Sequence, residues 1–100
     1  MTDTVVLVVE FTARADTVDE LRERLLELTR LTRAEAGCLR YDLHSDAADP
    51  LRLAFVEEWA SAEAHAAHDR TPWVAEFRAH RARLLVPDGV RRLDLRRLEP

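Results

Sequence analysis

The feature that most constrains the fold is the stretch at residues 4–13, TVVLVVEFTA, which is largely apolar on both faces when read with a period of two. Its β-branched residues predict a β-strand. One face holds only apolar side chains: Val5, Leu7, Val9 and Phe11. The other face begins with two valines and then becomes polar: Val6, Val8, Glu10 and Thr12. A strand of this kind is expected in the centre of a sheet that is covered on both sides.

A helix and a second strand follow this stretch. Residues 17–20, Thr-Val-Asp-Glu, have the pattern of a capping box. The helix that they open is predicted to end at Gly37, because glycine suits the position just after a helix. Its apolar positions recur three or four residues apart, at Val18, Leu21, Leu25, Leu28 and Leu31. The next strand is expected at residues 38–44, with one face formed by Leu39, Tyr41 and Leu43.

Residues 51–73 carry most of the candidate functional side chains. The turn composition of residues 45–50, SDAADP, predicts that the strand at residues 51–59 forms a hairpin with the preceding strand. One face of this strand is apolar except for one carboxylate, with the order Leu53, Phe55, Glu57 and Trp59. Ser61 is suited to cap a helix at residues 62–70, which carries His65 and His68. This strand and this helix could line one pocket with titratable side chains and an aromatic wall.

The chain starts a further helical segment at Thr71 and Pro72, since threonine is a good N-cap and proline suits the first helical position. Its core-facing stripe is expected to contain Trp73, Val74, Phe77, Leu84 and Leu85. Residues 87–89, Pro-Asp-Gly, are expected to end this segment, and residues 90–98 to form a last strand. The predicted order is β-α-β-β-α-β, with the second helix broken at Pro72.

This order predicts an α+β fold of the ferredoxin-like type, as a single domain over residues 1–100. The sheet would have four antiparallel strands with helices on one face only. Because the strands are apolar on both faces, something must cover the second face. A sheet from an identical subunit, packed about 10 Å away, would do so. The sequence therefore predicts a homodimer in the form of a dimeric α/β barrel.

Composition argues against several classes of protein. The net charge is −4 and the arginines are scattered, which disfavours nucleic acid as a partner. No run of about 18 apolar residues exists and no basic segment precedes an apolar stretch, so neither a membrane span nor a signal peptide is expected, and the location is predicted to be cytoplasmic. Gly37 and Gly89 are the only glycines, so neither a dinucleotide fingerprint nor a P-loop is present. The single Cys38 is interpreted as a small buried hydrophobic residue.

Each candidate residue has a structural alternative. His68 could act as a base or a hydrogen-bond donor near neutral pH, or it could be a structural histidine. Trp59 could form a wall for a planar ring, and the Tyr41 hydroxyl could reach the same cavity, or both could simply pack in the core. Glu57 interrupts an apolar stripe, so a partner is expected, either an arginine, His68 or a hydroxyl; a structural ion pair is the preferred interpretation. His65 and His68 share a helix face but have no clear third ligand, so no metal site is predicted.

Four parts of the chain form a recognisable pattern: VVLVVEF at the start, AEAGCLRYDLH, FVEEW followed by ASAEAHAAH, and TPWVAEF. Together they resemble the antibiotic biosynthesis monooxygenase (ABM) domain family, which includes quinol monooxygenases. The departures from the family pattern are His65 and Asp69, which stand where apolar residues are usual, and Phe55, which stands where some polyketide-oxidising relatives have an asparagine. The first strand also lacks the asparagine of relatives that degrade haem, so haem degradation is disfavoured.

The resemblance implies oxygen insertion into an electron-rich quinol or polyketide-like substrate, without flavin, haem or metal. In that chemistry His68 would accept the phenolic proton or bind the phenolate, Trp59 and Phe55 would hold the ring, and Glu57 would orient a neighbouring group. Tyr41, Trp73 and His65 would complete the substrate site. The partners would be O₂, a small aromatic substrate and a second copy of the chain.

Two other functions stay open at this level. One family relative is an isomerase of a small phosphorylated ketone, and the phosphate would need arginines such as Arg78, Arg81 or Arg40. Alternatively, the protein is a non-catalytic ligand-binding or stress-related dimeric barrel, in which Glu57 and His68 are structural.

Overall fold

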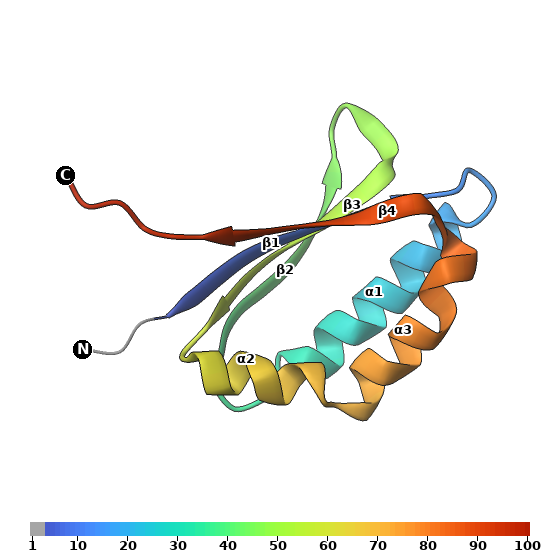
Figure 1. Ribbon diagram of the computed structural model, residues 1–100. Coiled ribbons are helices and arrows are strands. Elements are labelled where there is room, and N and C mark those ends of the chain that lie inside the picture. Colours follow the sequence, from blue (N-terminus) through green and yellow to red (C-terminus); the bar gives the residue numbers. More distant parts are fainter. Residues whose placement is uncertain (1–3) are drawn as a thin grey trace.

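The computed structural model describes residues 4–100 and shows one four-stranded antiparallel sheet with three helices on one of its faces (Figure 1). The strand order is β2-β3-β1-β4. The elements are β1 (Val5–Ala13), α1 (Val18–Thr32), β2 (Cys38–Asp46), β3 (Asp49–Trp59), α2 (Ala62–Asp69), α3 (Pro72–Leu84) and β4 (Leu85–Leu95). The predicted ferredoxin-like α+β fold, with its second helix broken at Pro72, is confirmed.

Strand β1 lies in the centre of the sheet, between β3 and β4, as its two apolar faces predict. Leu7 and Phe11 are buried under the helices, whereas Val6 and Val8 on the opposite face are half-buried. The register places Leu7 between Glu57 of β3 and Asp94 of β4. It therefore places a carboxylate from each neighbouring strand beside Leu7, near one end of the sheet.

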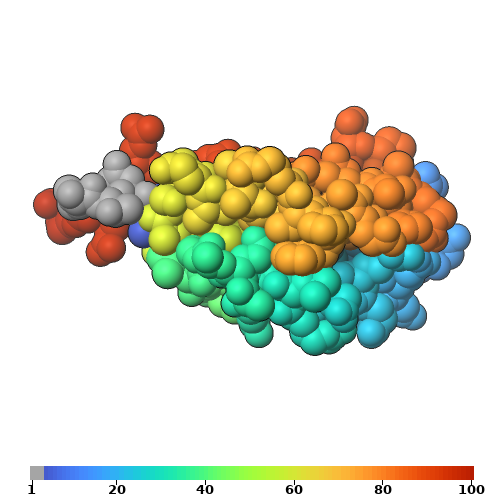
Figure 2. Space-filling model, turned by 90° about the horizontal axis from the view of Figure 1, so that it is seen from below, coloured from blue at the N-terminus to red at the C-terminus, as the bar shows by residue number. Residues whose placement is uncertain are grey.

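Helix α1 packs Leu21, Leu25 and Leu28 into the core, whereas Leu31 of the predicted stripe is exposed. Helices α1 and α3 contact each other and lie side by side in Figure 2. The predicted capping box is wrong. The Thr17 hydroxyl donates to the Leu84 carbonyl at 2.7 Å and accepts no helix N–H, while Glu20 binds Arg24 and Arg83. The hydroxyl finds this partner because the end of α3 lies beside the start of α1.

Gly37 does not end α1, contrary to the prediction, because the helix stops at Thr32. Gly37 instead lies in the turn before β2 with φ +82°, and a Cβ there would be 2.6 Å from the Cβ of Ala64 in α2. Its carbonyl accepts a hydrogen bond from the Ala60 N–H at 2.8 Å. Glycine is required here because it permits the positive φ and the close approach of α2.

Strands β2 and β3 form the predicted hairpin, although its turn is shorter than residues 45–50. The prediction that Leu39 shares one face of β2 with Tyr41 and Leu43 is wrong. A bulge between Cys38 and Arg40 places Cys38 opposite Trp59 and leaves Leu39 57% exposed. The extra residue of a bulge reverses the alternation, and the simple period-two interpretation does not anticipate this.

The caps of α2 and α3 are confirmed. The Ser61 hydroxyl accepts from the Ala64 N–H at 3.1 Å, and the Thr71 hydroxyl accepts from the Val74 N–H at 3.3 Å. The predicted break at residues 87–89 lies inside β4, which begins at Leu85. There Asp88 has φ 56° and the pairing with β1 shifts register, so the turn residues make an irregularity in a strand.

The second face of the sheet bears no helix (Figure 1). It carries an apolar cluster, formed by the half-buried Val6, Val8 and Val56 and the exposed Leu93 and Leu95, and polar residues such as Glu10, Glu58 and Arg91 lie beside this cluster. Within residues 4–100, no helix combines the length and the apolar character needed to span a membrane.

Candidate functional site

A cavity of about 230 Å³ lies between the sheet and helices α2 and α3; we call it the sheet–helix cavity. Its apolar lining comes mostly from the strands, and its titratable lining comes from β3, β4, α2 and α3. The apolar and aromatic residues are Leu7, Val9, Phe11, Tyr41, Phe55, Phe77 and Val90, and the titratable ones are Glu57, His65, Asp69, Arg78, Arg81 and Arg92. Such a lining suits a flat, largely apolar ligand that carries a few polar groups.

Glu57 projects from the central strand β3 and is 4% exposed. Its carboxylate accepts a hydrogen bond from the Trp59 indole N–H at 3.0 Å. The expected structural ion pair of Glu57 is wrong for the described residues 4–100, in which no cationic side chain lies within 4 Å of it. Burial raises the pKa of the Glu57 carboxyl, because the charged form loses its hydration. Glu57 therefore holds a proton more readily than an exposed glutamate.

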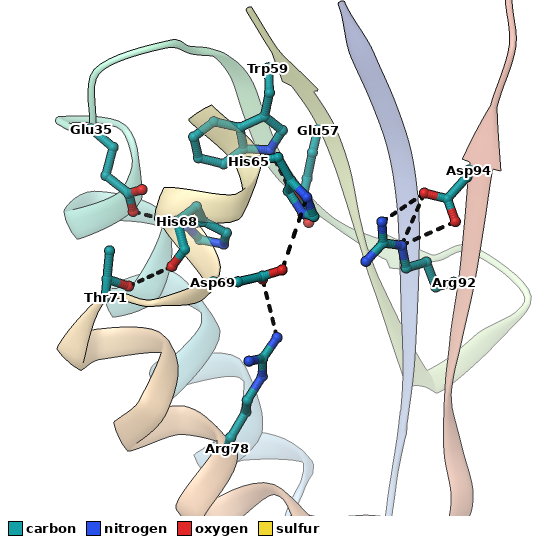
Figure 3. Close-up of polar contacts among 10 residues, drawn as sticks. All are labelled: Glu35, Glu57, Trp59, His65, His68, Asp69, Thr71, Arg78, Arg92 and Asp94. Carbon is teal, nitrogen blue, oxygen red and sulfur yellow. Dashed lines mark hydrogen bonds and ion pairs between the residues drawn. The ribbon is translucent and has the colours of Figure 1, made fainter. Parts of the chain in front are cut away.

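His65 reaches the same cavity from α2 (Figure 3). Its Nδ1 lies 4.0 Å from a carboxylate oxygen of Asp69, and Asp69 accepts a hydrogen bond from Arg78 at 3.1 Å. Burial lowers the pKa of the His65 imidazole, since the cationic form loses its hydration. His65 is therefore neutral at pH 7 and can accept a proton. A neutral base and a carboxyl group with a raised pKa thus face one aromatic-lined cavity.

His68 is 5% exposed and does not belong to the cavity lining. Its Nδ1 lies 2.9 Å from a carboxylate oxygen of Glu35, and the Trp73 indole N–H donates to the same oxygen at 2.7 Å (His68 and Glu35 are shown in Figure 3). Because a carboxylate only accepts, this contact places the proton of the neutral imidazole on Nδ1. The His68 ring lies against Trp59, with ring centroids 4.7 Å apart.

The predicted aromatic residues separate into two groups. Tyr41 and Phe55 line the sheet–helix cavity with centroids 4.3 Å apart, while Trp59 is fully buried and does not belong to the lining. Burial raises the pKa of the Tyr41 hydroxyl, which stays protonated at neutral pH. Trp73 lines a different depression between α1 and α3, with Leu28, Leu31 and Phe77 among its neighbours.

Two pairs in or beside the site were missed by the sequence analysis. The Arg92 guanidinium of β4 binds Asp94 at 2.7 Å, and Arg92 lines the cavity (Figure 3). The alternation of Arg92 and Asp94 with leucines was a usable signal, because it places both charges on one face of β4. Glu35, the partner of His68, lies in an irregular turn 33 residues away and gave no such signal.

No group of three metal-binding side chains occurs among residues 4–100. The rings of His65 and His68 are 6.1 Å apart, and each has its own carboxylate neighbour. These contacts give both histidines roles that need no metal.

The fold and this cavity together define a class: small ferredoxin-like α+β proteins with a ligand-sized space between sheet and helices. More specifically, the chain matches the antibiotic biosynthesis monooxygenase family model over residues 4–83, and it belongs to this family. The predicted family is thereby confirmed, together with a general monooxygenase-like function.

Individual relatives agree with this assignment. The chain is 35% identical over 86 residues to "Putative monooxygenase Rv0793" of Mycobacterium tuberculosis, covering 86% of this chain and 84% of that protein. The solved structure of Rv0793 superposes with a TM-score of 0.89 at 32% identity, covering 98% of each chain. The structure of PA3566 from Pseudomonas aeruginosa gives a TM-score of 0.91 at 32% identity, covering 99% of this chain and 98% of that one.

Proposed function

We propose that the protein is a cofactor-independent monooxygenase that oxidises a small aromatic substrate, a quinol or a polyketide-like phenol, with O₂ in the sheet–helix cavity. The observation that carries this proposal is the convergence of His65 and Glu57 on one aromatic-lined cavity. Triplet O₂ reacts slowly with closed-shell molecules, so the protein must make the substrate a better electron donor. Deprotonation in a site that excludes water does this.

In the first step His65 accepts the phenolic proton of the substrate. The lowered pKa of His65 keeps its ring neutral and ready to act as a base, and Nε2 is the free nitrogen because Nδ1 faces Asp69. Phe55 and Tyr41 form a surface for the ring of the substrate. General bases of this kind contribute about 10²- to 10⁴-fold to a rate.

The phenolate then gives one electron to O₂, and the resulting radical and superoxide combine to form a carbon–oxygen bond. Cleavage of the O–O bond leaves one oxygen on carbon, and the other leaves as water. A hydroquinone is thereby converted with one O₂ to a hydroxyquinone and one water, so atoms and electrons balance. Glu57, whose raised pKa favours the protonated form, is placed to donate a hydrogen bond to the developing oxyanion.

His68 and Trp59 act in this proposal as positioning residues instead of touching the substrate. The Trp59 indole N–H holds Glu57, and the His68 ring, itself held by Glu35, packs on Trp59. Trp73 donates to the same Glu35 and supports this arrangement from α3. Substrate contact by Trp73 would require a ligand in the separate depression between α1 and α3.

We also propose that two copies pair through the open face of the sheet. This face carries Val6, Val8 and Val56, with the exposed Leu93 and Leu95 at its β4 side. A contiguous apolar surface of this kind is typical of an interface. Light scattering at micromolar concentration should give the mass of a dimer, and the mass of one chain would contradict this pairing.

Oxygen uptake with a panel of hydroquinones and hydroxylated naphthalenes tests the catalytic proposal. We expect substrate loss that requires O₂ and consumes it one to one. The rate should fall about 10²-fold or more in His65→Gln, which removes the base, and should also fall in Glu57→Leu, which cannot donate a hydrogen bond to the oxyanion. The matched control is His80→Gln, because His80 lies on α3 paired with Glu76 and does not line the cavity. Equal rates in all four proteins, or turnover without O₂, would contradict the proposal.

The isomerase alternative has one supporting observation, because Arg78 and Arg81 both line the cavity while Arg40 is paired with Asp42 on β2. It predicts turnover of a phosphorylated ketone under anaerobic conditions. A non-catalytic binding protein would instead show ligand-induced thermal stabilisation without turnover. A ligand at one hundred times its Kd adds about 2.7 kcal/mol, which a thermal shift detects.

A further inference from the structure

Three arginines from two elements converge on the sheet–helix cavity. Arg78 and Arg81 come from α3 and Arg92 comes from β4, and all three belong to the lining. Among residues 4–100, the carboxyl groups that face the same space are those of Glu57 and Asp69. The cationic side chains therefore exceed the acidic ones.

Two of these arginines already have carboxylate partners, and the third does not. Arg78 donates to Asp69 at 3.1 Å, and Arg92 donates to Asp94 at 2.7 Å. Within residues 4–100, no carboxylate lies within 4 Å of the Arg81 guanidinium. Arg81 is also partly buried, so its charge is less well solvated than that of a freely exposed arginine.

The register of the sheet places Arg81 away from Glu57. Glu57 pairs with Leu7, whereas Val90 pairs with Phe11, four residues further along β1. Arg81 and Val90 both line this cavity and also an adjacent hollow that contains Arg14, which locates Arg81 at the Val90 end. Four residues of strand span about 13 Å, which is longer than a single benzene ring.

The space between these two ends is aromatic. Phe55 pairs with Val9, midway between Leu7 and Phe11, and Phe77 packs edge-on against Phe11 with centroids 5.5 Å apart. Burial raises the pKa of Glu57 and lowers that of His65, which favours the neutral form of each group at the Leu7 end. Among the arginines that line the cavity, Arg81 is the one whose guanidinium has no carboxylate within 4 Å in the described residues.

We propose that the cavity binds a multi-ring aromatic acid, with its carboxylate on Arg81 and its hydroxylated ring beside Glu57 and His65. Arg81 is then a specificity residue, and the preferred substrate is an anionic fused-ring phenol in place of a neutral single-ring quinol. This inference rests on the proposed function, since it names the substrate class of the same cavity.

The test compares two probes that differ in one charge, 5,8-dihydroxynaphthalene-2-carboxylate and its methyl ester. Dissociation constants are measured by calorimetry without O₂, so that oxidation does not contribute. We expect the acid to bind about tenfold more tightly than the ester, as a charge-assisted hydrogen bond would provide. This difference should shrink at high salt.

Arg81→Gln should remove the preference for the acid and leave the affinity for the ester unchanged. Arg83→Gln is the matched control, because Arg83 lies on the same helix, is exposed and binds Glu20 away from the cavity. It should keep the preference, and thermal melting should show that both variants are folded. Equal affinities for acid and ester in the unmodified protein, or a preference that survives Arg81→Gln, would overturn the inference.

These outcomes are independent of the oxidation chemistry. Failure of every probe to consume O₂ would overturn the proposed function, while an Arg81-dependent preference for the acid would still support an aromatic-acid site. Oxidation of neutral quinols without any preference for the acid would overturn the inference and support the function.

Discussion

The helix layer covers two regions of the same sheet in different ways. Under α1 the space is filled, and Leu21, Leu25 and Leu28 are buried there. Beside α2 and α3 the space is partly empty and is lined by Glu57, His65 and the arginines. The filled region provides stability, and the incompletely filled region provides the candidate site.

The difference follows from what each helix offers the sheet. Helix α1 presents leucines three or four residues apart, which interlock with the strands below. Helix α2 has only eight residues, AEAHAAHD, and its alanines are too small to reach far into the core. Its two histidines fill part of the space that the alanines leave, and the rest stays open as a cavity. A short alanine-rich helix therefore leaves a cavity with titratable side chains beside it.

The largest expected effect lies in the filled region. Leu25→Ala removes a fully buried side chain and should lower the free energy of unfolding by about 2–5 kcal/mol, because a cavity replaces its contacts. Chemical denaturation measures this change. The corresponding change Val9→Ala beside the sheet–helix cavity should lower the free energy of unfolding by much less. An equal loss would contradict the contrast between a filled region under α1 and a partly empty region beside α2 and α3.

Gly37→Ala should have the next largest effect, at the point where the turn before β2 meets α2. The new Cβ would lie 2.6 Å from that of Ala64, and a residue with φ +82° is strained unless it is glycine. A loss of about 1–3 kcal/mol in the free energy of unfolding is expected from the strain, with the clash in addition. The double variant Gly37→Ala, Ala64→Gly removes the clash between the two Cβ atoms but keeps the strained φ. It should therefore regain only the part of the lost unfolding free energy that is due to the clash.

Glu57→Gln should raise the melting temperature at pH 7. The folded protein holds the Glu57 proton more tightly than the unfolded chain, because burial raises its pKa above 4.5. Stability therefore falls as pH rises from about 4.5 through the folded pKa, and glutamine removes this loss. The melting temperatures of the two proteins should converge near pH 4; a variant that is less stable at pH 7 would show that the charge is stabilising.

The smallest effect is expected for Glu20→Gln in the exposed network with Arg83 and Arg24. Hydrogen bonds from these arginines lower the pKa of Glu20 to about 2, so the contribution is present above about 4.5 and is lost as pH falls towards 2. Solvent screens exposed ion pairs. The change in melting temperature at pH 7 should be the smallest of the series and should vanish in high salt.

Much of the fold could be predicted from the sequence because the relevant signals are local. Alternation in β1, the leucine spacing of α1 and the caps at Ser61 and Thr71 depend only on residues within a turn or two. The failures at Leu39 and at residues 87–89 occur where β-strand pairing is irregular. Irregular pairing depends on the partner strand, which local periodicity does not describe.

By itself the sequence determined the order of elements, the apolar faces of the sheet and the delivery of Glu57, Trp59, His65 and His68 to one corner of the fold. Only the tertiary structure decided which of these side chains face the sheet–helix cavity. His68 turns to Glu35, 33 residues away, and the Thr17 hydroxyl turns to Leu84, 67 residues away. The physical reason is that a buried polar group takes whichever partner the packing brings within hydrogen-bond distance, and that partner can lie anywhere along the chain.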